Sequence, residues 1–191
     1  MSVFRWTAPV FKLASRRWSV DDFCRYASLL RAYVPSGGRL IDLAGGTGDL
    51  GAGVAACLDA RVLIADATGQ MLARVDPHPS VSVSLTTADR LPFPDASFDA
   101  LICSDAFHHF PDQDAVTDEI ARVVRPGGGV LILDFEPIGV MRVAAVLERL
   151  VGEPATFLGA EDLQKLLHRK DIHGGFTRQS RISYTFLGVR G

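Results

Sequence analysis

The sequence contains little cysteine and no paired cysteine motif. Only three of its 191 residues are cysteine, and Cys24, Cys57 and Cys103 each stand among apolar residues. There is no C-x-x-C motif and no cluster of histidine and cysteine with metal-ligand spacing, so we expect no metal site. We interpret the three cysteines as reduced core thiols, which favours a cytoplasmic location.

An excess of positive charge and a long hydrophobic run are also lacking. The formal net charge is −2 at pH 7, whereas nucleic acids and anionic membranes attract basic faces. No apolar run approaches the length of a transmembrane helix. Arg16 and Arg17 precede no apolar segment of the kind found in export signals. We therefore expect neither a nucleic-acid partner nor an integral membrane segment, and the oligomeric state stays open.

The composition is that of an ordinary globular protein, with 48% hydrophobic and 22% charged residues. From residue 38 onward, short apolar runs alternate with segments that favour helix. We expect strands at 39–43, 61–65, 81–87, 98–103 and 130–135, and helices at 49–58, 69–75 and 114–124. The Pro-Gly run at 125–129 is expected to end the last of these helices. This alternation predicts an α/β fold with a doubly wound, mostly parallel sheet.

The two ends of the chain are less regular. Residues 2–33 are amphipathic and rich in aromatic side chains, which predicts helix. Apolar spacing predicts further helices at 140–151 and 161–167. Residues 181–189 fit either an antiparallel edge strand or a tight hairpin. The length suits one domain, over residues 1–191.

The most informative motif is LIDLAGGTGDLG, residues 40–51, in which an apolar strand leads through a glycine-rich turn into a helix. Glycine lets the main chain approach a ligand closely because it has no Cβ. Asp66 ends the next apolar run. An acid at this spacing can accept hydrogen bonds from the two ribose hydroxyls of a nucleotide-like ligand.

Two classes of ligand fit this turn. Gly46, Gly48 and Gly51 satisfy the G-x-G-x-x-G spacing of dinucleotide sites. However, Asp42 precedes the turn and Asp49 follows it, and two carboxylates favour a ligand that carries positive charge, such as S-adenosylmethionine. Asp49 has an alternative role as a partner of the helix dipole.

Two further strand ends carry polar side chains where ligands bind in open α/β sheets. Asp89 follows one strand and can accept the exocyclic amino group of adenine, although it also fits a turn-capping role. Ser104 ends another strand, and His108 and His109 follow it. Histidine suits proton transfer near neutral pH, so His109 and His108 are the candidate catalytic residues. Asp105 is the nearest acid that could orient them.

With these residues placed, the sequence resembles the class I S-adenosylmethionine-dependent methyltransferases. It is most similar to the ubiquinone/menaquinone biosynthesis C-methyltransferases, which fall in the methyltransferase type 11 group. The resemblance covers about residues 38–137. The motifs that carry it are DLAGGTGDL (42–50), ADATGQML (65–72), ADRLPFPDASFD (88–99), RVVRPGGGVLILDF (122–135) and, weakly, VFRWTAPVF (3–11).

The resemblance implies a Rossmann-like fold, S-adenosylmethionine as the cofactor and a small-molecule acceptor. The expected cofactor-contacting residues are Asp42, Ala44, Gly45, Gly46, Thr47, Gly48, Asp66, Ala67, Met71, Thr87, Ala88, Asp89 and Ser104. We divide the single domain into an N-terminal helical lid (1–34), a cofactor-binding core (38–137) and a shortened C-terminal part (138–191).

The sequence departs from that family on the acceptor side. The family has an Arg-Asn pair where this chain has His108 and His109, and a Tyr-Asp pair where it has Phe11 and Lys12. A long segment after the fifth strand is largely missing. We expect methyl transfer to a small molecule, with a quinone-like acceptor as one option. We also expect the aromatic N-terminal region to form a lid, with Phe11 and His109 on opposite walls of the acceptor pocket. The alternatives are a non-catalytic cofactor-binding or interaction protein and, less favoured, an NAD-dependent oxidoreductase.

Overall fold

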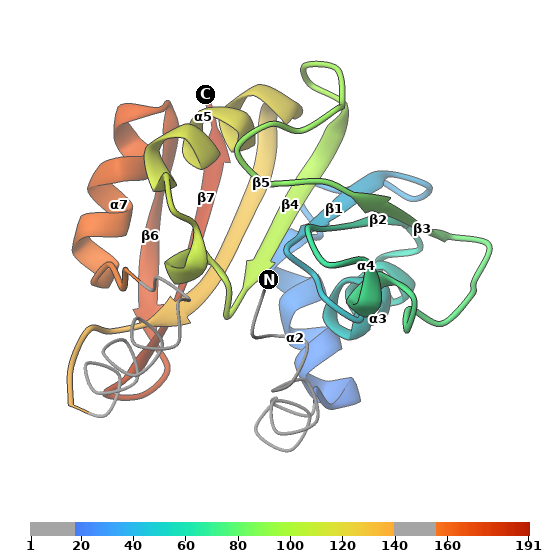
Figure 1. Cartoon of the computed structure of the whole chain (residues 1–191), viewed down its shortest axis with the longest axis horizontal. Helices are drawn as coiled ribbons and strands as arrows, with labels where there is room; N and C mark the ends of the chain where they lie inside the picture. Colours follow the sequence, from blue (N-terminus) through green and yellow to red (C-terminus); the bar gives the residue numbers. More distant parts are fainter. Residues whose placement is uncertain (1–17, 140–155) are drawn as a thin grey trace.

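The computed structural model describes residues 18–139 and 156–191 and contains a seven-stranded sheet. Its strand order is β3-β2-β1-β4-β5-β7-β6, which runs from right to left in Figure 1. The strands are β1 (Arg39–Leu43), β2 (Arg61–Asp66), β3 (Val81–Leu85), β4 (Phe98–Ser104), β5 (Val124–Phe135), β6 (Ile172–Arg178) and β7 (Ser183–Arg190).

Strands β1 to β5 are parallel, whereas β7 is antiparallel to both β5 and β6. The predicted doubly wound sheet is confirmed. Of the two interpretations of the C-terminal segment, the structure has the hairpin, with β6 at the edge of the sheet. The chain order reverses between β1 and β4, so the ends of these neighbouring strands form the switch point at which such sheets bind ligands.

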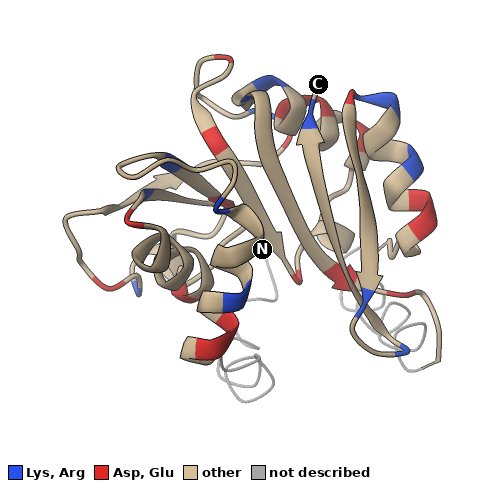
Figure 2. Ribbon diagram, turned by 180° about the vertical axis from the view of Figure 1, so that it is seen from behind, with Lys and Arg blue, Asp and Glu red and all other residues tan. Residues whose placement is uncertain are grey.

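Helices cover both faces of the sheet. One apolar core contains residues of α2 (Val20–Leu30), α3 (Asp49–Leu58) and α4 (Gly69–Leu72). The other contains residues of the 3₁₀ turn η1 (Phe107–His109), α5 (Gln113–Val123) and α7 (Ala160–Arg169). In Figure 2, α7 carries acidic residues at its beginning and basic residues near its end, an arrangement that complements the helix dipole.

The boundary between α5 and β5 differs most from the sequence prediction. Helix α5 ends at Val123, and β5 begins at Val124 and includes the Pro-Gly run. Phe98 pairs with Val124 but Ala100 pairs with Gly129, so β5 bulges across residues 125–128. Gly127 has a φ of +73°, which favours glycine. The Pro-Gly run therefore ends the helix as expected but lies within the strand that follows.

Several sequence predictions concern residues that the structure places differently or does not describe. The helix predicted at 140–151 and the lid wall at Phe11 lie outside the described residues. The interpretation of all cysteines as core residues was wrong: Cys103 is buried in β4, but Cys24 on α2 is exposed and Cys57 on α3 is half-buried. No helix within residues 18–139 and 156–191 is long and apolar enough to cross a membrane.

Close packing of α3 against β1 fixes the geometry of the glycine turn. The N–H of Gly51, in the first turn of α3, donates to Oδ2 of the buried Asp42 at 3.1 Å. A Cβ added at Gly51 would lie 2.5 Å from that oxygen and 2.6 Å from the Cβ of Asp42. No side chain fits between helix and strand, which is the role of the third glycine in such turns.

A methyl group at Gly51 should therefore push α3 away from β1. We expect Gly51→Ala to lower the free energy of unfolding by about 1–3 kcal/mol, as overpacked sites do. The matched control is Gly175→Ala, because a Cβ at this exposed glycine would meet nothing within 4 Å. Urea unfolding of both variants checks the expectation, and equal midpoints for the two would contradict it.

Candidate functional site

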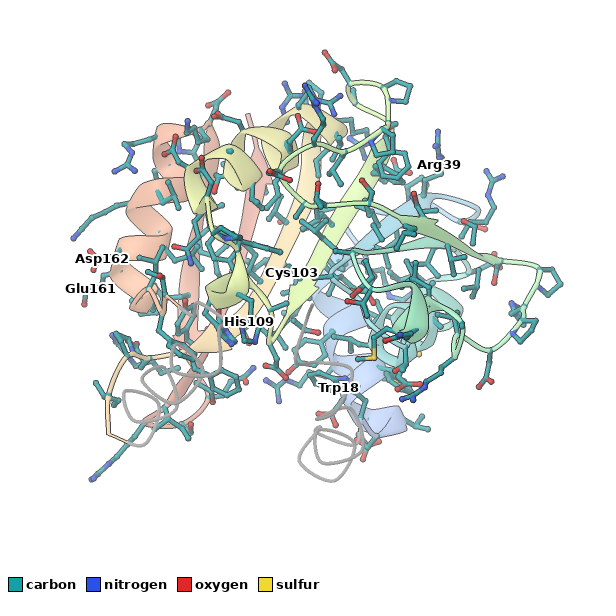
Figure 3. The ribbon with its side chains drawn as sticks, in the orientation of Figure 1. Trp18, Arg39, Cys103, His109, Glu161 and Asp162 are labelled. Carbon is teal, nitrogen blue, oxygen red and sulfur yellow. The ribbon has the colours of Figure 1, made fainter. Side chains whose placement is uncertain are left out.

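The candidate site lies at the carboxyl edge of the parallel strands. Register brings their ends together, because Leu43 pairs with Ala65, Asp66 with Leu85, and Ser104 with Leu133. Four of the predicted segments follow these strand ends: the glycine turn, Asp66, residues 87–89 and the histidine pair. Figure 3 shows His109 near the arrowhead end of β4. The fold thus collects groups that are far apart in the sequence at one edge.

The glycine turn joins β1 to α3 in a conformation that needs glycine. Gly46 and Gly48 have φ values of +57° and +77°. Ala44 also has a positive φ, of 55°, and its N–H donates to the carbonyl of Ala65 at 2.7 Å. The N–H of Gly48 donates to the carbonyl of Gly45 at 2.8 Å. These hydrogen bonds hold the main chain of the turn against the end of β2.

Asp66 and the glycine turn contact each other directly. One carboxylate oxygen of Asp66 accepts the N–H of Gly46 at 2.9 Å, and the other accepts the N–H of Thr68 at 2.7 Å. The carboxylate is half-buried, so it is fixed in place yet open on one side. Each carboxylate oxygen has further acceptor capacity for a ligand hydroxyl. The predicted pairing of turn and acid is present in the structure.

Asp42 lies beneath this turn, and its carboxyl group is fully buried. Burial raises the pKa of Asp42 to about 7, although the hydrogen bond from Gly51 opposes this shift. The negative charges of Asp66 and Asp49 raise it further. Among the described residues, Oδ1 of Asp42 is the only fully buried side-chain nitrogen or oxygen without a hydrogen-bond partner. A cationic ligand nearby would favour the ionised form of this group.

The other predicted cofactor residues flank the turn. The methyl group of Met71 would lie 3.6 Å from a Cβ at Gly46, so Met71 lies beside the turn. The hydroxyl of Thr47 donates to Asp49 at 2.7 Å, at the N-terminus of α3. Ala67, Thr87 and Asp89 are exposed, while Gly45, Ala88 and Ser104 are half-buried.

The loop that carries Asp89 is held by residues that sequence reasoning missed. Arg122 on α5 donates to the carbonyls of Leu91 and Phe93, at 2.9 and 2.7 Å. It also pairs with Glu119, whose carboxylate accepts the N–H of Leu91. The hydrogen bond from Arg122 is the main cause that lowers the pKa of Glu119. An Arg–Glu pair three residues apart on a helix was the available signal, but such pairs are common on exposed faces.

His108 is oriented by Asp134, which the sequence analysis also did not single out. Nδ1 of His108 lies 2.6 Å from Oδ1 of Asp134, and the His108 N–H donates to Oδ2 at 3.0 Å. Asp134 is buried near the end of β5. An ionised carboxylate can only accept a hydrogen bond, so Nδ1 is the donor in this pair, and in a neutral ring Nε2 keeps the lone pair. An acid inside the apolar run VLILDF was the signal available in the sequence.

Two aromatic rings pack against the His108 ring. Phe157 stacks on it with ring centroids 4.2 Å apart, and the ring of His109 lies at 4.1 Å. The N–H of Thr156 donates to the His108 carbonyl at 2.7 Å and so holds Phe157 in place. Burial lowers the pKa of His109 to about 4, and His108 adds to the effect. His109 is therefore a neutral imidazole near pH 7 and a weak proton acceptor.

The residues present fit S-adenosylmethionine as a cofactor. Asp66 offers acceptor oxygens for a ribose diol, and the bare backbone of Gly46 permits close approach. The unpartnered oxygen of Asp42 provides negative potential under the turn. A pyrophosphate fits poorly, because Asp49 in the first turn of α3 and Asp42 in its ionised form would both repel it.

Comparison with known proteins agrees with this assignment. Residues 40–128 match the family described as "Methyltransferase domain". The ubiquinone/menaquinone biosynthesis C-methyltransferase UbiE of Chromobacterium violaceum is 33% identical over 121 residues, or 60% of this chain. The aligned part is 50% of that relative, so the chain spans about half the length of the curated protein it matches.

Solved structures show the same fold at low identity. A chain from the complex between the Haloferax volcanii methyltransferase activator Trm112 and a methyltransferase has a TM-score of 0.71 at 16% identity. The alignment covers 92% of this chain and 99% of that one. Phosphoethanolamine N-methyltransferase 2 of Haemonchus contortus, solved with phosphomonomethylethanolamine and S-adenosylhomocysteine, has a TM-score of 0.70 at 15% identity. That alignment covers 87% of this chain and 52% of the enzyme. The predicted resemblance to the class I S-adenosylmethionine-dependent methyltransferases is thereby confirmed, with residues 40–128 matching the methyltransferase domain.

Proposed function

We propose that this protein transfers a methyl group from S-adenosylmethionine to a small-molecule acceptor. The observation that carries the proposal is the hydrogen bond from Gly46 to Asp66, which joins the glycine turn after β1 to the acid at the end of β2. The UbiE relative supports methyl transfer, and a quinone-like acceptor is one option that its name suggests for this chain.

The cofactor end of the site is assigned to three groups of residues. Asp66 accepts the ribose hydroxyls, and the main chain of residues 44–48 with Asp42 and Met71 surrounds the amino-acid end. Ala67 and residues 87–89 flank the adenine, and Ser104 lies toward the acceptor. When bound, the cofactor supplies an activated methyl group on a positively charged sulfur. The protein then needs chiefly to align the acceptor and exclude water.

His108 is the proton acceptor for a substrate that must lose a proton. Asp134 fixes the tautomer that leaves Nε2 free, and a carboxylate stabilises the imidazolium formed when the proton arrives. His109, neutral near pH 7, contacts the acceptor as a hydrogen-bonding group rather than as the base. The site therefore suits an acceptor whose nucleophile carries a proton, such as a hydroxyl or an activated carbon.

The competing function is a cofactor-binding or interaction protein without turnover. A panel of small-molecule acceptors, including quinols and phenols, distinguishes the two functions. The proposal expects formation of S-adenosylhomocysteine and a methylated product with at least one acceptor class. Cofactor binding without product for any class would favour the non-catalytic alternative.

Asp66→Ala should weaken binding of S-adenosylhomocysteine by about 1.5–3 kcal/mol, the range for hydrogen bonds to a charged group. Calorimetry measures the effect, with Asp76→Ala as an exposed control outside the site. Because Asp66 also holds the turn, thermal unfolding must first show that the variant is folded. Unchanged affinity in the folded variant would remove Asp66 from the site.

The raised pKa of Asp42 predicts a pH dependence of stability. The folded protein keeps the Asp42 proton up to about pH 7, whereas the unfolded chain releases it near 3.8. The folded state binds more protons between these values, so the free energy of unfolding falls as the pH rises through this window. The slope is at most about 1.4 kcal/mol per pH unit. Asp42→Asn should remove this contribution in urea unfolding from about pH 4 to pH 7, whereas Asp76→Asn should retain it.

Asp134 should act on turnover through His108 as a positioning residue. With a productive acceptor, Asp134→Asn should lower kcat by about 10²–10⁴-fold, the usual share of a general base. Cofactor affinity should not change, because Asp134 contacts no part of the glycine turn. If the acceptor is acidic enough to lose its proton without His108, raising the pH should restore part of the rate that Asp134→Asn loses. A uniform loss at every pH, or none at all, would show that Asp134 has no role in proton transfer.

A further inference from the structure

Two cysteines from different helices are in contact outside the candidate site. The Sγ atoms of Cys24 and Cys57 are 3.5 Å apart, although the residues are separated by 33 positions in the sequence. Cys24 lies on α2 and is exposed, and Cys57 lies near the end of α3 and is half-buried. Neither thiol has a role in the proposed methyl transfer.

The contact results from helix packing rather than from the chance orientation of two mobile side chains. Next to Cys24, the ring of Phe23 lies over Gly53 of α3, and a Cβ at Gly53 would be 2.5 Å from that ring. Arg31 at the end of α2 donates to the Cys57 carbonyl at 3.1 Å. Contacts on both sides of the thiols thus hold α2 and α3 together, so the two sulfur atoms stay close.

The two thiols differ in reactivity. Burial and the contact with Cys24 raise the pKa of Cys57, and its position near the negative end of the α3 dipole also disfavours a thiolate. Cys24 is exposed to dissolved oxidants. Cys24 is thus the thiol that reacts first, and Cys57 is the one that reacts second. Cys103 is fully buried in β4 and cannot meet an oxidant in the folded protein.

We propose that Cys24 and Cys57 form a reversible disulfide with a low-molecular-weight disulfide as the oxidant. The Cys24 thiolate attacks one sulfur of the oxidant and expels one thiolate, which leaves a mixed disulfide on Cys24. Cys57 loses its proton to solvent, attacks Sγ of Cys24 and expels the second thiolate. Two protein thiols are oxidised, and one disulfide is reduced to two thiols.

The crosslink would join α2 to α3, the helix that follows the glycine turn and has Gly51 in its first turn. It restricts the unfolded chain by closing a loop of 33 positions. The oxidised protein should therefore melt at a higher temperature than the reduced protein. The redox state of the surroundings would then determine whether α2 is covalently joined to α3.

The test is to incubate the native, fully reduced protein with oxidised glutathione. Unfolding it without reductant and titrating its thiols then reports the disulfides that formed. We expect loss of two of the three thiols, a Cys24–Cys57 peptide in the digest, a monomer on a non-reducing gel, and recovery of three thiols with dithiothreitol. Cys57→Ser should instead retain glutathione on Cys24. Cys24→Ser should resist oxidation, and Cys103→Ser should crosslink as the wild type does.

Three outcomes would overturn the proposal. One is that all three thiols survive in the wild type. The second is that glutathione stays on Cys24 although Cys57 is present. The third is that the bond forms between two chains. Serine is close to cysteine in size, and the unfolding curve of each reduced variant verifies that it is folded before its thiols are interpreted.

Discussion

The hydrogen bond from the Gly46 N–H to the Asp66 carboxylate fixes the candidate site, because it joins the turn after β1 to the end of the neighbouring strand β2. It requires the positive φ of Gly46, and it requires α3 to begin close to β1. Asp42 secures that second condition by accepting the N–H of Gly51 from below. The turn is therefore held between the carboxyl groups of Asp66 and Asp42, and the negative charge of Asp49 and of ionised Asp42 favours a cationic cofactor over a pyrophosphate.

The acceptor side is organised by a separate pair of groups. Strand β4 delivers His108 and His109 to the edge, and the neighbouring β5 delivers Asp134. Because Asp134 is buried and accepts from both the ring and the backbone of His108, the imidazole has one defined orientation. Burial lowers the pKa of His109, so this imidazole stays neutral near pH 7. Two adjacent histidines thus have different chemistry, because Asp134 holds the ring of His108 whereas burial lowers the pKa of His109.

Sequence reasoning found what depends on local pattern. The apolar strands, the glycine turn and the spacing to Asp66 follow from short-range rules, and the sheet confirms them. The partnership of His108 with Asp134 depends on the register of β4 and β5, since the residues are 26 positions apart. The contact between Cys24 and Cys57 depends on how two helices pack, which no spacing in the sequence encodes. Hydrophobic flanks alone could not separate the buried Cys103 from these two thiols.

The most direct measurement for the central claim is calorimetric titration of the purified protein with S-adenosylmethionine and, separately, with NAD. The account predicts saturable binding of S-adenosylmethionine at one site per chain, because the turn and Asp66 form a single pocket edge. It predicts no binding of NAD at the same concentrations, because Asp49 and the ionised form of Asp42 repel a pyrophosphate. Saturable binding of NAD, or no heat with S-adenosylmethionine from a folded protein, would contradict the account.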